Sequence, residues 1–187
     1  MDHFDLLAPI YDRLIAPPSE EYLSQFAALP VEGPVLDVGG GTGRIAAGLK
    51  DQTSSMVLLD RSRKMLQEAG NKADFHRITG SSDQLPFNSD SFERVLVVDA
   101  YHHFSNQSTC LQELWRVVSP GGRLVIEEPD IDHFAVKLVA LAEKLTLFTS
   151  HFERPEKIGA ALETLGASIE IHRRDHNAWV VAEKLIR

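Results

Sequence analysis

The chain has 187 residues, of which 43% are hydrophobic and 25% charged, a balance that favours one globular domain with a sizeable core. Acidic residues outnumber basic ones by 27 to 19, and this charge of −8 disfavours nucleic acid, whose phosphates reward a basic surface. Cys110 is the only cysteine, which excludes an intramolecular disulfide and a cysteine-built metal site. No run is apolar enough to cross a bilayer and no secretory signal begins the chain, so we expect a cytoplasmic protein without membrane contact.

The first 30 residues are expected to form a helical lid over a core domain that spans 31–187. A turn at 16–20, "APPSE", predicts the start of a helix that continues to Pro30. Glu20 and Glu21 suit its first turn because they complement the positive end of the helix dipole. Tyr11 lies upstream and is the candidate lid residue, with ordinary packing as the alternative.

From residue 34 onward, strand-like and helix-like segments alternate. Apolar runs predict strands at 34–39, 55–60, 74–80, 93–100 and 121–129, and helical patterns lie between them at 43–50, 62–70 and 107–118. Strands separated by helices imply right-handed crossovers and therefore a parallel sheet.

The C-terminal part follows a different pattern. Helical stretches at 131–148 and 155–165 precede two strand-like segments, 168–174 and 178–185. Their connection is too short for a parallel crossover, so the last two strands should form an antiparallel hairpin. The predicted fold is an α/β/α sandwich of Rossmann-like type, with a seven-stranded, mostly parallel sheet and this hairpin at its end.

A glycine-rich stretch, "VLDVGGGTGRIA" at 35–46, joins the first strand to a helix and indicates a ligand site. A triphosphate loop would end in Gly-Lys-Ser/Thr, whereas Arg44 and Ile45 follow Gly43 here. A dinucleotide loop is a closer match, because "GTGRIA" satisfies G-x-G-x-x-A and Asp60 lies near the spacing of a ribose-binding acid. However, no tyrosine is followed four positions later by the lysine that a short-chain dehydrogenase needs, so an NAD-binding protein remains the weaker alternative.

A third ligand class fits the wider motif. Asp37 stands before glycines at every second position, and an acid there would repel a pyrophosphate but attract an ammonium or sulfonium group. With this motif, three further segments, "LLDRSRKML", "SSDQLPFNSDSFERVLVVDAYHHF" and "LQELWRVVSPGGRLVIEEPD", resemble the class I S-adenosylmethionine-dependent methyltransferases over residues 31–187. A reversed terminal strand is also a feature of that family.

Within the family, "FDLLAPIYDRL" and "GGTG" resemble the ubiquinone/menaquinone biosynthesis methyltransferases and their small-molecule relatives. The chain departs from the quinone enzymes at Tyr101-His102-His103, where they carry Leu-Arg-Asn, and at Gly80-Ser81-Ser82, where relatives carry Gly-Asp-Ala. The resemblance therefore implies a small-molecule acceptor without implying a quinone. It leaves the methylated atom and the oligomeric state open.

The resemblance also implies a binding site for S-adenosylmethionine and its product, S-adenosylhomocysteine. Gly39, Gly41 and Gly43 would let the backbone approach the methionyl part. Thr42 would bond the ligand or cap the following helix. Asp37 would act on the amino group through the loop or water.

The nucleoside part would meet residues at the ends of the second and third strands. Asp60 would accept both ribose hydroxyls, or cap the helix that follows. Arg61 or Met65 would pack on adenine, with a surface arginine and a core methionine as alternatives. The adenine amino group would bond one of three residues after the third strand, Ser81, Ser82 or Asp83.

Asp99, at the end of the fourth strand, is assigned to the cofactor site. With acids after the fifth strand, Glu127, Glu128 and Asp130, it also raises a magnesium hypothesis, since oxygen ligands suit that ion. The Asp-Asn pair expected of such enzymes is missing, so we predict no metal.

His103, or failing it His102, is the candidate catalytic residue. In parallel α/β sheets ligands lie beyond the carboxyl ends of the strands, and "YHHF" directly follows the fourth strand. An imidazole there could orient or deprotonate the acceptor, with a purely structural role as the alternative. Helix 131–148 and "TSHFERPE" would build the acceptor pocket. The predicted function is methyl transfer to a small molecule; the alternative is a cofactor-binding sensor or partner subunit without transferase activity.

Overall fold

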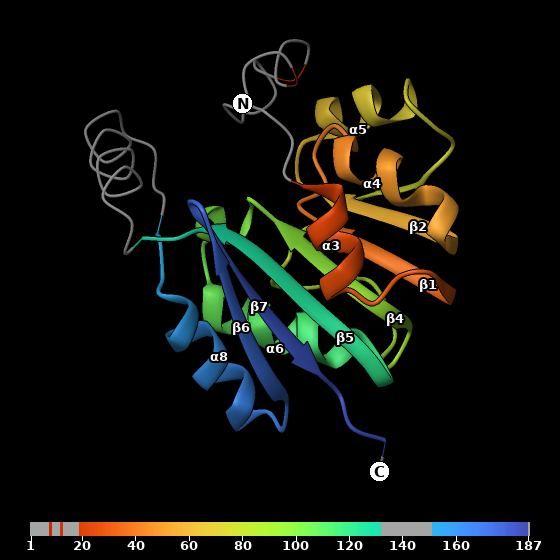
Figure 1. The fold of residues 1–187 in the computed structure, drawn as a ribbon. Helices are drawn as coiled ribbons and strands as arrows, with labels where there is room; N and C mark the ends of the chain where they lie inside the picture. The colour runs from red at the N-terminus through yellow and green to blue at the C-terminus, as the bar shows by residue number, and fades with distance from the viewer. Residues whose placement is uncertain (1–7, 9–11, 13–18, 132–150, 187) are drawn as a thin grey trace.

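A computed structural model describes the chain at Ala8, Asp12 and residues 19–131 and 151–186 (Figure 1). Its seven strands are β1 (Val31–Val38), β2 (Thr53–Asp60), β3 (His76–Thr79), β4 (Phe92–Val98), β5 (Val118–Pro129), β6 (Ser168–Arg174) and β7 (Asn177–Glu183). Tyr11 and the helix predicted at 131–148 lie outside the described residues, as does most of the predicted N-terminal lid.

All seven strands form one sheet in the order β3-β2-β1-β4-β5-β7-β6. Strands β1 to β5 pair in parallel, whereas β7 runs antiparallel to both β5 and β6. The predicted fold class is confirmed, including the C-terminal hairpin, whose second strand inserts beside β5. Strand order reverses between β1 and β4, the position where parallel α/β sheets bind ligands.

The helices begin and end close to where their capping residues predict. They are α3 (Glu20–Phe26), α4 (Arg44–Leu49), α5 (Arg63–Gly70), α6 (Gln107–Val117) and α8 (Pro155–Thr164), with 3₁₀ turns η1 (Lys50–Gln52) and η2 (Tyr101–His103). Ser19 caps α3 by accepting the Tyr22 N–H. The prediction that this helix continues to Pro30 is wrong, because Ala28 adopts a left-handed φ of 49° and breaks it.

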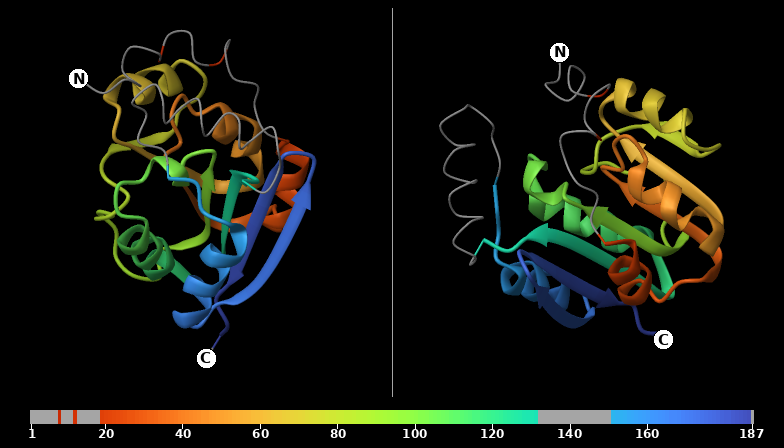
Figure 2. Two further views of the ribbon diagram at one scale, coloured as in Figure 1. Left: turned by 90° about the vertical axis from the view of Figure 1, so that its left-hand side faces the viewer. Right: turned by 45° about the horizontal axis from the view of Figure 1, so that its top comes forward.

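Two hydrophobic clusters fill the two faces of the sheet. Alternate residues of the parallel strands pack on α3, α4 and α5 on one face and on α6 and α8 on the other, the arrangement drawn in Figure 2. In β1, for example, Val35 belongs to the first cluster and Leu36 to the second. Burial on both faces explains why these strands are continuously apolar.

Candidate functional site

The glycine loop leaves the carboxyl end of β1 with three left-handed residues. Gly39, Gly41 and Gly43 have φ angles of 76°, 52° and 68°, which side chains rarely tolerate. A Cβ on Gly43 would lie 2.9 Å from the Ala69 Cβ, so this glycine permits close packing of the loop on α5. Among the described residues, a Cβ on Gly41 would have only the Gly39 carbonyl oxygen within 4 Å, at 3.8 Å, so the described structure leaves space beside it.

Four backbone N–H groups of this loop are bonded within the protein. Gly39 and Gly40 N–H donate to the Leu59 carbonyl at 2.8 and 3.3 Å, and Gly43 N–H donates to the Gly40 carbonyl at 2.8 Å. The Gly41 N–H donates to Asp60 Oδ2 at 2.9 Å. A phosphate-binding loop needs such N–H groups for its anion, so this geometry argues against the triphosphate and dinucleotide alternatives.

Asp37 is a buried acid with one unpartnered oxygen. Its side chain is 2% exposed, and Oδ2 has no hydrogen-bond partner in the described structure. Burial first, and the nearby Asp60 carboxylate second, raise its pKa to about 7, against the opposing effect of Arg44. A buried, unpartnered carboxyl group is costly unless a donor completes it, and a ligand ammonium group is a suitable donor.

Asp60 ties the glycine loop to the start of α5. While Oδ2 accepts the Gly41 N–H, Oδ1 accepts the Ser62 N–H at 2.7 Å. The capping alternative for Asp60 is wrong, because Ser62 is the N-cap and accepts the Met65 N–H at 3.1 Å. Each carboxylate oxygen can accept a further bond, so the predicted ribose contact remains compatible with this geometry.

Thr42 contacts the N-terminal part of the chain. Its hydroxyl donates to Asp12 Oδ1 at 2.5 Å and is buried, with 1% of the residue exposed. The capping alternative for Thr42 is wrong, since Gly43 occupies the N-cap of α4 and no side chain bonds there.

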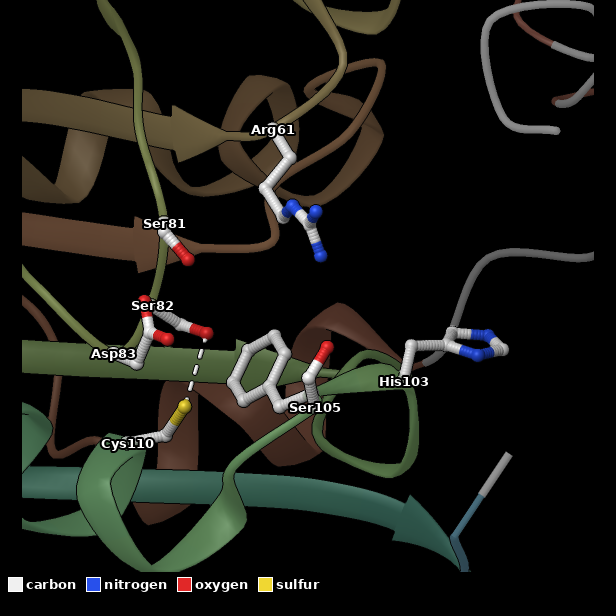
Figure 3. Close-up of a pocket in the computed structure, with 8 residues that line it drawn as sticks. Arg61, Ser81, Ser82, Asp83, His103, Ser105 and Cys110 are labelled. Carbon is white, nitrogen blue, oxygen red and sulfur yellow. Dashed lines mark hydrogen bonds between the residues drawn. The ribbon is translucent and has the colours of Figure 1, made fainter. Parts of the chain in front are cut away.

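A pocket of about 130 Å³ opens beside the ends of β2, β3 and β4 (Figure 3). It brings together the predicted nucleoside contacts Arg61, Ser81, Ser82 and Asp83 with His103, and its other lining residues are Phe104, Ser105 and Cys110. In Figure 3, Ser82, Asp83 and Cys110 lie together on one side and His103 on the other, with its ring turned away from them. Met65 is 2% exposed and does not line this pocket, so the core alternative holds for it.

Cys110 is 1% exposed and lines the pocket. Its Sγ lies 3.2 Å from Ser82 Oγ, so the two side chains hold each other in place. Burial raises the pKa of the Cys110 thiol, which suits packing better than nucleophilic chemistry.

His102 is held inside the fold by Glu128. Its Nδ1 lies 2.6 Å from Glu128 Oε2, and its ring stacks on Phe152 at 4.4 Å between centroids. Glu128 also accepts the N–H groups of Ala100, Tyr101 and His102, at 3.0, 2.8 and 3.3 Å. This single carboxylate therefore fixes the η2 turn, and His102, 4% exposed, acts as part of the support.

His103 is the histidine that lines the pocket. Burial first, and the neighbouring His102 ring second, lower its pKa to about 3. The ring is therefore neutral near pH 7 and is a weak base, better suited to hydrogen bonding than to holding a proton.

The acids that raised a magnesium hypothesis have protein partners. Glu127 accepts bonds from Asn177 Nδ2 at 2.7 Å and Trp179 Nε1 at 2.9 Å, and burial raises its pKa to about 7. Asp130 pairs with Arg173 Nε at 3.0 Å. Asp99, with a left-handed φ of 52°, lies 3.7 Å from the Arg44 guanidinium. No group of three His, Cys, Asp or Glu in the described parts of the chain has a geometry that would hold a metal ion.

Sequence reasoning did not predict the structural roles of four residues that shape this site: Asp12, Lys72, Arg44 and Glu128. Asp12 and Lys72 hold Thr42, and Arg44 lies among three acids, Asp12, Asp37 and Asp99. Asp12 lies in "YD" and Glu128 in "EEP". Their contacts join residues that are far apart in the chain, so no local sequence pattern predicts them.

Comparison with known proteins adds independent information. Residues 36–126 match the model of a methyltransferase domain. The ubiquinone/menaquinone biosynthesis C-methyltransferase UbiE of Geotalea daltonii is 29% identical over 150 residues, which are 71% of this chain and 64% of that one. Over residues 36–126 the chain resembles the class I S-adenosylmethionine-dependent methyltransferases. The comparison supports the predicted family, and S-adenosylmethionine is the cofactor that defines it.

Solved methyltransferases share the fold. A methyltransferase in complex with the Haloferax volcanii Trm112 methyltransferase activator has a TM-score of 0.79 at 18% identity, covering 100% of this chain and 99% of that one. DhpI in complex with SAH has a TM-score of 0.73 at 18% identity, covering 99% and 95%. By sequence, the chain spans about half the length of most of the curated relatives it matches. In the described residues, no helix is long and apolar enough to cross a membrane.

Proposed function

We propose that this protein binds S-adenosylmethionine at the glycine loop and transfers its methyl group to a small molecule. The observation that supports this most is the buried Asp37 carboxyl group, whose Oδ2 lacks a hydrogen-bond partner among the described residues, beside a loop in which four N–H groups are already bonded. That combination suits a cationic ligand and disfavours a phosphate. The acidic charge of the chain agrees with an acceptor other than nucleic acid.

Different residues of the site would contact different parts of the cofactor. Asp37 would bind the amino group, Asp60 would receive the ribose hydroxyls, and Ser81, Ser82 or Asp83 would bond adenine beside Arg61 in the pocket. Arg44 and Asp99 lie beside the loop as a cation and an anion, 3.7 Å apart, and match the charges of an amino-acid end.

The bound cofactor supplies a methyl group already activated on a sulfonium centre. The protein then lowers the barrier chiefly by holding the acceptor close and aligned. His103 lines the pocket with its ring turned away from Ser82 and Asp83, and it is neutral near pH 7, so we assign it to orienting the acceptor by a hydrogen bond. The segment that contains Phe152 lies against His102 and forms part of the predicted acceptor side.

Removal of the His103 ring tests this assignment once an acceptor is known. An orienting hydrogen bond predicts that His103→Ala lowers turnover about tenfold at every pH. A general base would instead lose about 10²–10⁴-fold, and the loss would shrink as the pH rises and the acceptor ionises unaided.

Calorimetric titration tests the proposed function itself. The protein should bind S-adenosylhomocysteine with micromolar affinity, roughly 8 kcal/mol, and should not bind NAD or ATP. A screen of small molecules with labelled methyl donor would then identify the acceptor. Binding of NAD without a response to S-adenosylhomocysteine would overturn the proposal.

A cofactor-binding partner subunit is the second candidate. Its support is the shared fold with a methyltransferase that was solved in complex with an activator protein. Turnover by the isolated chain favours the enzyme, whereas cofactor binding with turnover only in the presence of a second protein favours the subunit.

A further inference from the structure

Two side chains from outside the glycine loop, Asp12 and Lys72, contact Thr42 and each other. The Thr42 hydroxyl donates to Asp12 Oδ1 at 2.5 Å, and Lys72 Nζ lies 2.6 Å from Asp12 Oδ2. The same ammonium group donates to the Thr42 carbonyl at 2.6 Å. We refer to Asp12, Thr42 and Lys72 as the loop clasp.

The clasp acts where the loop has the most backbone freedom. Thr42 stands between Gly41 and Gly43, both with positive φ, and glycines have the widest range of accessible conformations. The preceding residues, Gly39 and Gly40, are already bonded to the Leu59 carbonyl of β2. The clasp therefore restrains the part of the loop that β2 does not reach.

The members of the clasp come from three separate parts of the chain. Asp12 and Lys72 are each 30 residues from Thr42, one before the first strand and one just after α5. Burial raises the pKa of Asp12, but bonds from Lys72 and Thr42 outweigh this and leave its pKa below the ordinary value. Asp12 is therefore ionised near pH 7 and holds a charged pair with Lys72.

Resting on the function proposed above, we infer that Asp12 and Lys72 are positioning residues of the cofactor site, which hold the glycine loop through Thr42 in the shape that receives the ligand. Neither residue lines the pocket, so both act through Thr42.

The chain provides a closely matched control pair. Lys184 Nζ lies 2.6 Å from Asp90 Oδ1 and also donates to the Trp115 and Val118 carbonyls, as Lys72 does to Thr42. The side chains of Asp90 and Lys184 are 48% and 23% exposed, against 39% and 28% for Asp12 and Lys72. Asp90 precedes β4 and so lies at the opposite end of the strands from the site.

The experiment measures melting temperature and S-adenosylhomocysteine affinity for Asp12→Asn, Lys72→Met, Asp90→Asn and Lys184→Met. We expect the two clasp variants to weaken binding about 5- to 10-fold, and the two control variants to stay within about twofold of the parent protein. Melting temperatures should fall by similar amounts in both pairs, so that affinity separates positioning from general stabilisation. The affinity loss in the double variant Asp12→Asn/Lys72→Met should be smaller than the product of the two single-variant losses. Each single substitution already breaks the same set of contacts.

Substitutions of Thr42 separate the clasp from direct ligand contact. Thr42→Ser keeps the hydroxyl and should retain affinity, whereas Thr42→Val should match Asp12→Asn. Weakened binding by Thr42→Val with unchanged binding by Asp12→Asn and Lys72→Met would overturn the clasp and favour a direct contact. If the parent protein itself fails to bind S-adenosylhomocysteine, the proposed function falls and the clasp role falls with it.

Discussion

Two buried acids occupy equivalent positions at the ends of β1 and β5 yet have opposite surroundings. Asp37 and Glu128 are each the penultimate residue of their strand, 2% and 6% exposed. Glu128 accepts three backbone N–H groups and contacts the His102 ring. Asp37 has one oxygen, Oδ2, with no hydrogen-bond partner in the part of the chain that the structure describes.

This difference separates the framework of the site from its binding surface. A carboxylate surrounded by donors stabilises the fold and has little capacity left for a ligand. A carboxyl group that is buried without a donor raises the free energy of the empty protein. A ligand that donates a hydrogen bond to this group removes that cost. Burial of an acid alone, therefore, does not identify a binding residue in this fold; its unused bonding capacity does.

Glu128→Ala is expected to have the largest effect of the changes considered. It would strand three backbone N–H groups and the His102 ring, and unpartnered buried donors cost about 1–3 kcal/mol each, so stability should fall by about 5 kcal/mol. Urea unfolding measures this loss. Glu128→Gln is the matched control and should lose less, since its amide oxygen still accepts. A loss of under about 1 kcal/mol in Glu128→Ala would contradict the framework role.

The raised pKa of Asp37 predicts that the empty protein loses stability as the pH rises. Its folded pKa of about 7 lies above its ordinary value of 3.8, so the contribution is full below pH 4 and is lost as the pH passes 7. The difference corresponds to roughly 4 kcal/mol.

Urea unfolding between pH 5 and pH 8 checks this prediction. Asp37→Asn should flatten the decline, and Glu127→Gln should flatten it in part, since the Glu127 pKa is also raised to about 7. Saturating S-adenosylhomocysteine should remove the Asp37 contribution and leave that of Glu127. An equal decline in the parent protein and in Asp37→Asn would show that Asp37 is ionised in the empty site.

Asp60 should behave between these two acids, because it has structural partners and capacity for a ligand. Asp60→Ala should lower S-adenosylhomocysteine affinity by about 1.5–3 kcal/mol, and it should also lower stability by about 1–2 kcal/mol through its lost bonds to Gly41 and Ser62. Asp60→Asn should lose less of both, because it keeps one acceptor. Calorimetry and thermal unfolding of the same samples distinguish the two effects, and normal binding by a folded Asp60→Ala protein would remove the ribose role.

Much of the fold could be predicted from the sequence because local patterns encode it. Runs such as "VLLD" and "RVLVV" are apolar on both faces, and the short segment between β6 and β7 allows only an antiparallel pair. The end of α3 could not be predicted, because it depends on a left-handed alanine with no glycine or proline at that position.

The parts of the site that could be predicted are those fixed by residue type or by position at the end of a strand. The three glycines that the sequence singles out adopt left-handed conformations, which glycine tolerates best, and the residues after β2 and β3 do meet in one pocket. The partners of Asp12, Lys72 and Glu128 could not be predicted, because each is fixed by contacts across the fold. The sequence ranked His103 above His102 but could not predict their different contacts, since His102 bonds Glu128 and His103 lines the pocket.

The most direct test of the account is titration of S-adenosylhomocysteine at pH 7 in two buffers that differ in ionisation enthalpy. A pKa of about 7 means that Asp37 is about half protonated in the empty protein, so an incoming ammonium group should release about half a proton. Asp37→Asn should bind about tenfold more weakly and release none. Binding by the parent protein without proton release, together with equal affinity in Asp37→Asn, would contradict the claim that this unpartnered acid receives the ligand.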